Sequence, residues 1–160
     1  MGMNQRNAVR MTEHEIDTYL SIHRPATMAT IGPDGLIHQV AMYFAWFDGA
    51  LSLLSKAKAQ KVLNLRRDPR CSLHVESGSK YDELAGVNLA GRAEILHDDA
   101  SLWEIGLQLN MRHQGPWEES RREWVERVLR NRVGIRLRPE RIVSWDHSKL
   151  PSGKDPASAR

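Results

Sequence analysis

The sequence predicts one small domain of mainly β structure, an antiparallel barrel of about six strands with a few helices. Its length of 160 residues and mass of 18.3 kDa suit a single compact domain. With 41% hydrophobic and 27% charged residues, it has the composition of a soluble globular protein that buries a core. Short hydrophobic stretches separated by tight turns, with one short basic helix between two of them, indicate the barrel.

The N-terminal half begins with a polar segment and a short helix. We expect residues 1–10 to be flexible because they are polar. Thr12 and Glu15 have the spacing of a capping box, which predicts a helix that starts after Thr12 and runs to about Ile22. Three strands, separated by turns rich in Gly, Pro and Asp, should follow over residues 26–31, 36–44 and 50–54.

A basic helix and an amphipathic strand come next. Residues 57–67 are rich in good helix formers, and the helix should end at Asp68 because this residue precedes Pro69. Hydrophobic and polar side chains then alternate through residues 70–76, which predicts a strand with one buried face. Cys71 lies on the hydrophobic side of this strand and is expected in the core.

The C-terminal half adds a long strand, a helical pair and a closing strand or two. The strand over residues 87–96 is interrupted at Gly91, where we expect a bulge or bend. The elements after it are helices over residues 98–111 and 117–131, and strands over residues 133–137 and 142–145. Residues 151–160 should form a disordered tail, so the folded domain is expected to cover residues 11–150.

Several classes of protein are excluded by composition. The single cysteine rules out an intrachain disulfide and a cysteine-rich zinc site, and it fits the reducing environment of the cytoplasm. The polar start lacks the apolar stretch of a signal peptide, and no run approaches the roughly 20 apolar residues that span a bilayer. We therefore expect a cytoplasmic protein that does not insert into membranes.

The sequence contains no recognisable catalytic motif. No histidine pair has the spacing of a zinc protease helix, so we expect no metal site. Nucleophile elbows and glycine-rich phosphate or dinucleotide loops are also missing from the sequence, and its catalytic residues stay unknown. Trp103, Trp117 and Trp124 fall in the helical pair, where packing is the expected role.

Positive charge is concentrated in one segment. The chain has a net charge of +3, yet residues 56–70 alone hold six cations and one anion. Such a compact cluster favours a small anionic ligand over a nucleic acid, which would also need aromatic residues among the cations. A solvated helix face is the alternative. Ser55, Lys56 and Lys61 stand where a strand enters a helix, a plausible site for a phosphate group.

Two motifs in this region carry a family resemblance. Residues 29–35 read Ala-Thr-Ile-Gly-Pro-Asp-Gly, and residues 61–70 read Lys-Val-Leu-Asn-Leu-Arg-Arg-Asp-Pro-Arg. Together with residues 91–94, they resemble the pyridoxamine 5'-phosphate oxidase-like, flavin-binding split β-barrel superfamily over about residues 22–145. The resemblance implies a six-stranded split barrel that forms a homodimer and binds FMN or the deazaflavin F-420 at the subunit interface.

The resemblance also implies roles for individual residues. Lys61 would bind the cofactor phosphate beside Ser55 and Lys56, while Asn64 would either contact the cofactor or brace the helix. Further candidates lie along the isoalloxazine ring or line the same pocket: Val40, Ala41, Met42, Tyr43, Met28, Thr30 and Trp145. Arg67 is a candidate that could instead be solvated.

The end of the chain departs from the vitamin B6 enzymes of this superfamily. They continue into an Arg-Leu-His-Asp-Arg substrate clamp, whereas residues 147–151 here read His-Ser-Lys-Leu-Pro. We therefore expect an oxidoreductase that moves a hydride between F-420 or FMN and a small unsaturated or heteroaromatic substrate, and not a strict pyridoxamine 5'-phosphate oxidase. The alternative is a noncatalytic protein that holds a flavin, a deazaflavin or haem for storage or sensing.

Overall fold

The computed structural model describes residues 5–23 and 25–150 of the chain. The disordered tail expected over residues 151–160 lies outside this part. The described strands are β1 (Ala26–Ile31), β2 (Ile37–Met42), β3 (Ala45–Phe47), β4 (Ala50–Lys56), β5 (Arg70–Ser77), β6 (Ala85–Leu96), β7 (Arg132–Leu137) and β8 (Arg141–Asp146). The described helices are α1 (Gln5–Ala8), α2 (Glu13–Ile22), α3 (Gln60–Arg67), α4 (Asp99–Gln114) and α5 (Arg122–Leu129).

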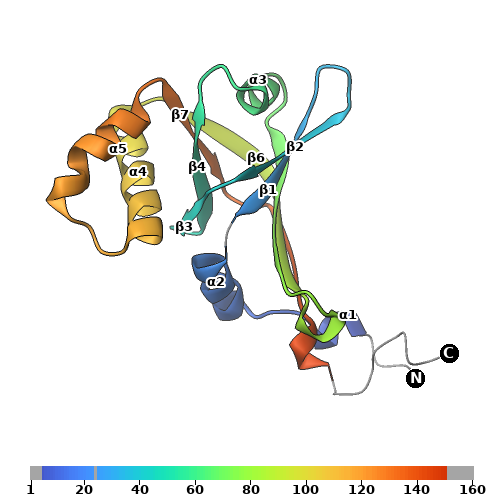
Figure 1. Cartoon of the computed structure of the whole chain (residues 1–160). Helices are drawn as coiled ribbons and strands as arrows, with labels where there is room; N and C mark the ends of the chain where they lie inside the picture. The colour runs from blue at the N-terminus through green and yellow to red at the C-terminus, as the bar shows by residue number, and fades with distance from the viewer. Residues whose placement is uncertain (1–4, 24, 151–160) are drawn as a thin grey trace.

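All strand pairs are antiparallel and belong to one curled sheet (Figure 1). The strand order is β2-β1-β5-β6-β7-β4-β3, and β8 pairs with β6 beside this path. The predicted mainly β, split-barrel fold is therefore confirmed. The predicted number of strands is too low, because the described residues form eight strands rather than about six.

The long strand β6 joins the two halves of the barrel. Its first part lies between β5 and β8, and its last part, from Ala93 to Leu96, pairs with β7. Gly91 stands at this change of partner, where a Cβ atom would come within 3.1 Å of the backbone nitrogen of Glu140. The predicted interruption at Gly91 is the point where the chain passes from one half to the other.

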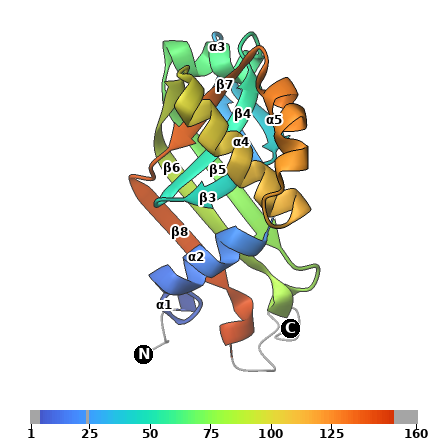
Figure 2. The same ribbon diagram turned by 90° about the vertical axis from the view of Figure 1, so that its left-hand side faces the viewer.

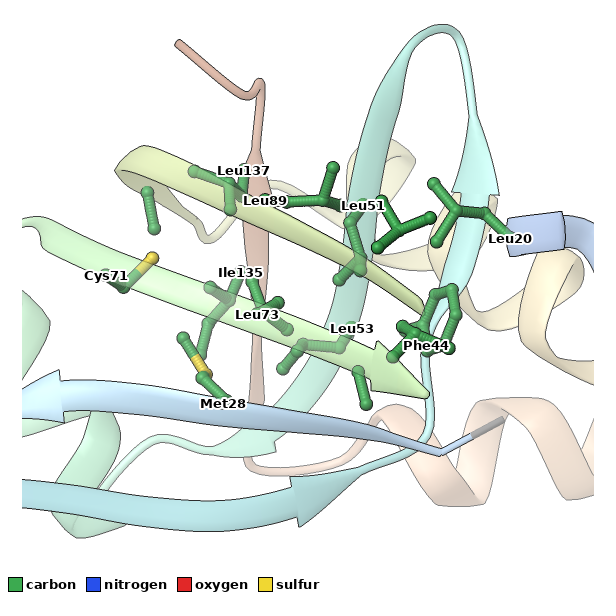
Figure 3. Close-up of a cluster of buried hydrophobic side chains, with 14 of the residues drawn as sticks. Leu20, Met28, Phe44, Leu51, Leu53, Cys71, Leu73, Leu89, Ile135 and Leu137 are labelled. Atoms are coloured by element: carbon green, nitrogen blue, oxygen red, sulfur yellow. The ribbon is translucent and has the colours of Figure 1, made fainter. Parts of the chain in front are cut away.

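The core fills the inside of the barrel (Figure 3). Leu73 on β5, Leu89 on β6 and Ile135 on β7 are completely or almost completely buried. Burial of each such side chain contributes about 1.5–3 kcal/mol to folding. As the alternation predicts, Cys71 is buried in this core on β5, and burial raises the pKa of its thiol to about 12. A core thiol of this kind does not act as a nucleophile.

Helices close two sides of the barrel (Figure 2). The predicted capping box of α2 is present, with the Thr12 hydroxyl accepting from the Glu15 backbone N–H and the Glu15 carboxylate accepting from the Thr12 N–H. The helix packs near β3, where the Trp46 indole donates to Asp17. The pair α4 and α5 covers β3, β4 and β7, and a second hydrophobic cluster forms beneath it.

The second predicted strand is divided in the structure. The sequence suggests one strand through residues 36–44, but β2 ends at Met42 and a separate β3 begins at Ala45. Tyr43 is exposed while Phe44 and Ala45 are both buried, so the alternation of a continuous strand is broken here. The guanidinium of Arg112 lies 4.3 Å above the Phe44 ring and covers this break.

Two predicted helices begin too early. α3 starts at Gln60 rather than at residue 57, because the Ala59 N–H bonds the Lys56 carbonyl in a turn. The helix expected over residues 117–131 is only α5, preceded by a 3-10 turn at Glu119–Arg121. Trp117 lies outside the helix, in edge-to-face contact with Trp103 at 5.8 Å between ring centroids.

The described residues near the N-terminus contact the end of the sheet. They include α1, and Val9 is buried against the barrel. The Val9 carbonyl accepts a hydrogen bond of 2.7 Å from the Asp146 N–H after β8. This contact links the described residues before α2 to the end of the sheet.

Candidate functional site

Two adjoining cavities form a groove between the sheet and the helical pair. Their volumes are about 780 Å³ and about 530 Å³. Trp124, Val128 and Arg132 line both of them, so α5 and the start of β7 form a wall that the two cavities share. The larger cavity is called the basic cavity below, and the smaller one, which reaches the end of β2, is called the β2 cavity.

The basic cavity is lined by cations from two distant parts of the chain. They are Lys56, Lys58, Arg127, Arg130 and Arg132. No acidic residue lines this cavity, and none of these five side chains has an ion pair or hydrogen bond with any other residue in the described part of the chain. The uncompensated charge gives the cavity a positive potential that favours an anion.

Some arginines outside this cavity are paired with carboxylates. Arg70 bonds Asp68, Arg121 bonds Glu118, and Arg136 bonds Glu104 at 3.0 Å. The cations of the basic cavity have no such partner among the described residues. In addition, the β4–β7 pairing places Lys56 directly opposite Arg132. Like charges at facing positions of antiparallel strands destabilise a sheet, and a bound anion would relieve this repulsion.

The β2 cavity brings together the end of β2 and the helical pair. Ala41, Met42 and Tyr43 line it from the sheet side, as the predicted ring-binding strand would. Across from them, the His113 ring on α4 contacts the Tyr43 ring edge-on, with 4.6 Å between centroids. The neighbouring candidate Val40 packs on the barrel core instead and does not line this cavity.

The predicted phosphate ligands lie close together at the start of α3. The Lys61 Nζ atom is 3.5 Å from the Ser55 Oγ atom, at the outer limit of a hydrogen bond. Ser55 is buried, and burial lowers the pKa of the Lys61 ammonium. Of these residues, Lys56 alone lines the basic cavity, whereas Ser55 and Lys61 line neither cavity of the groove.

Three of the predicted candidates lie inside the fold. Met28 is fully buried in the barrel core on β1. The Asn64 amide nitrogen donates to the Thr30 hydroxyl at 3.0 Å, and both side chains are buried. Asn64 also accepts from the Gln60 side chain at 2.9 Å. These contacts tie α3 to β1. The Arg67 guanidinium likewise donates to the Ile31 carbonyl on β1.

Trp145 lies at the other end of the sheet. It pairs with Gly86 near the start of β6, and its ring stacks on His74 at 5.5 Å between centroids. Ser55 faces Val133 on β7, next to the residue that pairs with Leu96 at the end of β6. Gly86 and Leu96 are ten residues apart on β6, which corresponds to about 33 Å at the usual rise of about 3.3 Å per residue.

Sequence reasoning missed the contribution of residues 124–132. Arg127, Arg130 and Arg132 are diluted there by nearby acidic residues, so net charge gives no signal. Trp124 was expected to pack, yet 51% of its surface is exposed and it borders both cavities. The available signal was the group of arginines after Trp124. Sequence alone could not interpret it, because these arginines join Lys56 only through the pairing of β4 with β7.

Two kinds of feature are not found among the described residues: a group of side chains that could hold a metal ion and a helix that could span a membrane. Across residues 5–23 and 25–150, no group of three or more His, Cys, Asp or Glu side chains could hold a metal ion. Within the same ranges, each helix is too short or too polar to cross a lipid bilayer.

Comparisons with known proteins identify the family and similar folds. The family model described as pyridoxamine 5'-phosphate oxidase matches residues 12–146. The crystal structure of the conserved hypothetical protein Rv2991 from Mycobacterium tuberculosis is 41% identical, with a TM-score of 0.89, and the match covers 96% of this chain and 97% of that one. A search of curated proteins found no match.

More distant structures have the same fold. One is an F420 reductase with 27% identity and a TM-score of 0.61, matched over 79% of this chain and 94% of that one. Another is HutZ, a haem-storage protein from Vibrio cholerae, with 18% identity and a TM-score of 0.66, matched over 82% of this chain and 94% of that one.

Proposed function

The chain belongs to the pyridoxamine 5'-phosphate oxidase family, and from this premise we propose that it is an oxidoreductase with a bound F-420 or FMN. It would move a hydride between this cofactor and a small unsaturated or heteroaromatic substrate. The observation that carries the proposal is the groove, in which five unpaired cations adjoin a cavity bordered by aromatic side chains. This arrangement suits a molecule that is anionic at one end and planar at the other.

The residues of the groove fit such a cofactor. The basic cavity would hold the phosphate end through Lys56, Lys58 and the arginines, which are good phosphate ligands. The β2 cavity would hold the ring system along Ala41, Met42 and Tyr43. When bound, the cofactor supplies the hydride chemistry, and the chain needs no nucleophile of its own.

The amount of charge favours F-420 over FMN. FMN ends in one phosphate group, whereas F-420 has a phosphodiester followed by a side chain with glutamate carboxylates. Five cations without protein counter-ions exceed what a single phosphate would neutralise. The 27% identity with an F420 reductase also supports this choice.

The side chains around the groove would act by binding and by excluding water. Val128 and Leu54 give the β2 cavity an apolar wall, while Met42 lies against the barrel core. Removal of water from the ring strengthens the electrostatic interactions around it. The Tyr43–His113 ring pair borders the same cavity.

We also propose that the protein is a homodimer. The strand β2 pairs with β1 alone among the described strands, so one backbone edge lacks a partner. Leu36, Ile37 and Tyr43 along this hairpin are 61–71% exposed, which is typical of an interface surface. A second subunit could also bring a Trp145 to the groove, which the same subunit's Trp145 does not reach.

Titration of the purified protein with F-420 and with FMN tests the cofactor proposal. We expect F-420 to bind more tightly, and we expect Lys56→Ala and Lys58→Ala, which remove cations that line the basic cavity, each to weaken binding roughly tenfold while the fold is retained. Arg66→Ala is the matched control, because it removes an exposed cation of α3 that does not line the groove. Circular dichroism of each variant checks the fold.

The outcomes separate the possible functions. Failure of the wild type to bind either cofactor would overturn the proposal, as would equal losses in Arg66→Ala and in the two test variants. Oxidation of reduced F-420 by a panel of small enones and nitro-heteroaromatic compounds would show turnover. Tight binding without turnover across the panel would instead support the noncatalytic alternative.

A further inference from the structure

Trp124 is unlike the other tryptophans of this protein. Trp46 donates a hydrogen bond of 2.8 Å to Asp17, Trp103 and Trp117 contact each other, and Trp145 stacks on His74. Trp124 has neither a ring contact nor a hydrogen bond with any residue in ranges 5–23 and 25–150. Half of its surface is exposed. A large aromatic surface left uncovered beside a cavity is typical of a ligand-binding position.

The packing of α5 fixes where Trp124 lies. The next residue, Val125, is buried against α4, where a Cβ atom at Gly106 would come within 3.1 Å of Val125 and Leu129 side-chain atoms. This close approach of the two helices turns the Val125 side of α5 towards α4. Trp124 and Val128, which are four residues apart and share a helix face, then border the groove.

Trp124 also stands at the boundary between charge and apolar surface. It lines the basic cavity beside Lys56 and Lys58, and it lines the β2 cavity together with Met42 and Tyr43. A ligand that places an anionic group in the first cavity and a ring in the second must pass this side chain. The indole is therefore available for stacking on the ring side of such a ligand.

We propose that Trp124 is a cofactor-binding residue whose indole stacks on the planar ring system of the bound F-420 or FMN. This inference rests on the proposed function, since it assumes that the groove is the cofactor site. Stacking on an aromatic side chain contributes enough that its removal weakens binding roughly 10- to 100-fold. The groove of the free protein would then be lined, on the α5 side, by a preformed aromatic wall.

The test measures the bound cofactor directly rather than enzyme activity. The cofactor is excited in its own visible band, where tryptophan does not absorb, and its emission is followed during titration. We expect the wild-type protein to quench this emission, because a stacked indole is an electron donor. Trp124→Phe should restore most of the emission with nearly unchanged affinity, and Trp124→Ala should restore it with a roughly 10- to 100-fold weaker affinity.

Trp117→Phe is the matched control, because this tryptophan packs on Trp103 and does not line the groove. It should leave both affinity and emission as in the wild type.

Trp124→Phe keeps a ring of similar shape, so the test does not depend on folding of the alanine variant. Wild-type affinity in Trp124→Ala together with unchanged quenching in both Trp124 variants would overturn the stacking role while leaving the cofactor proposal intact. Failure of the wild type to bind would overturn both.

Discussion

At the scale of single residues, Asn64 shows how a motif residue can serve the fold. Its side chain is buried, donates to Thr30 on β1 and accepts from Gln60 within α3. A buried polar group that loses its partner keeps the cost of its desolvation. Asn64, which belongs to the motif that resembles the family, therefore connects α3 to β1 of the barrel.

We predict that Asn64→Ala lowers the free energy of unfolding by about 1–3 kcal/mol. Removal of the amide leaves the Thr30 hydroxyl without its donor in a buried position. Urea denaturation of Asn64→Ala, Thr30→Val and the double variant would measure the coupling between the two side chains. Strictly additive effects of the two substitutions would contradict a stabilising hydrogen bond.

Individual residues also show where prediction from sequence stops. The polar and hydrophobic alternation around Cys71 correctly places that thiol in the core, because strand periodicity is a local property. Trp124 has no such local signal. Its exposure depends on the packing of Val125 against Gly106, and this contact joins two helices that are separated in the sequence.

At the scale of elements, α2 joins the two ends of the described chain. Lys149, after β8, donates to the Glu15 carboxylate at 2.6 Å and to the Arg10 carbonyl at 3.0 Å. The same carboxylate accepts from the Thr12 N–H in the capping box. The hydrogen bonds from Lys149 and from Thr12 lower the pKa of Glu15 from its usual 4.5 to about 2.

We predict that Glu15→Gln lowers the thermal midpoint near neutral pH. Since the folded-state pKa is depressed, the stabilisation by Glu15 is fully present above about pH 4.5 and is lost as the pH falls through about 2. The difference between the wild type and Glu15→Gln should therefore shrink over this range. Thermal melts followed by circular dichroism at several pH values would measure it.

Glu13→Gln is the control for this prediction. Glu13 lies in the same first turn of α2 but forms no ion pair with any of the described residues. Its substitution should change the midpoint less, and with no comparable dependence on pH. A pH-independent difference between Glu15→Gln and the wild type would contradict the role assigned to the carboxylate.

Helix starts that are capped by residues of the first turn could be predicted from the sequence, whereas the break between two strands could not. The Thr12 capping box and the Asp98 N-cap are both present, because each is made by residues within one turn. The division between β2 and β3 was missed because Val40, Met42 and Phe44 look like one alternating strand. Contact of Phe44 with Arg112 on α4, a distant segment, accompanies the break.

At the scale of the whole molecule, the sheet separates the predicted site residues into two ends. The groove lies where β4 pairs with β7, and Trp145 lies near the start of β6. The family resemblance implies that Trp145 contacts the cofactor, but within one subunit Trp145 does not line the groove. A homodimer in which the groove of one subunit meets the Trp145 end of the other would account for both. The free edge of β2 is the surface that we assign to this association.

We predict that the protein in solution has twice the mass of its 18.3 kDa chain. Ile37→Lys, which places a charge on the free edge of β2, should shift the mass towards that of one chain, because an interface core disfavours an unpaired charge. Size-exclusion chromatography with light scattering would measure both. Ile22→Lys, at a residue similarly exposed on α2, is the control and should remain dimeric. A monomeric wild type would contradict the prediction.

The sequence by itself determined the properties that depend on neighbouring residues. These are the strand periodicity, the helix caps and the motifs that indicate the family, and they were sufficient for the fold class. It also showed that positive charge is concentrated in residues 56–70, from which the binding of an anion is a prediction.

Only the tertiary structure decided how the candidate site is built. The β4–β7 pairing places Lys56 opposite Arg132, although 76 positions separate them in the chain. Packing of α5 on α4 and β7 brings Trp124 and two further arginines to the groove, while Thr30 and Asn64 lie in the interior. Strand pairing and helix packing act between segments that are distant in the chain, and the local pattern of a single sequence does not show which segments will meet.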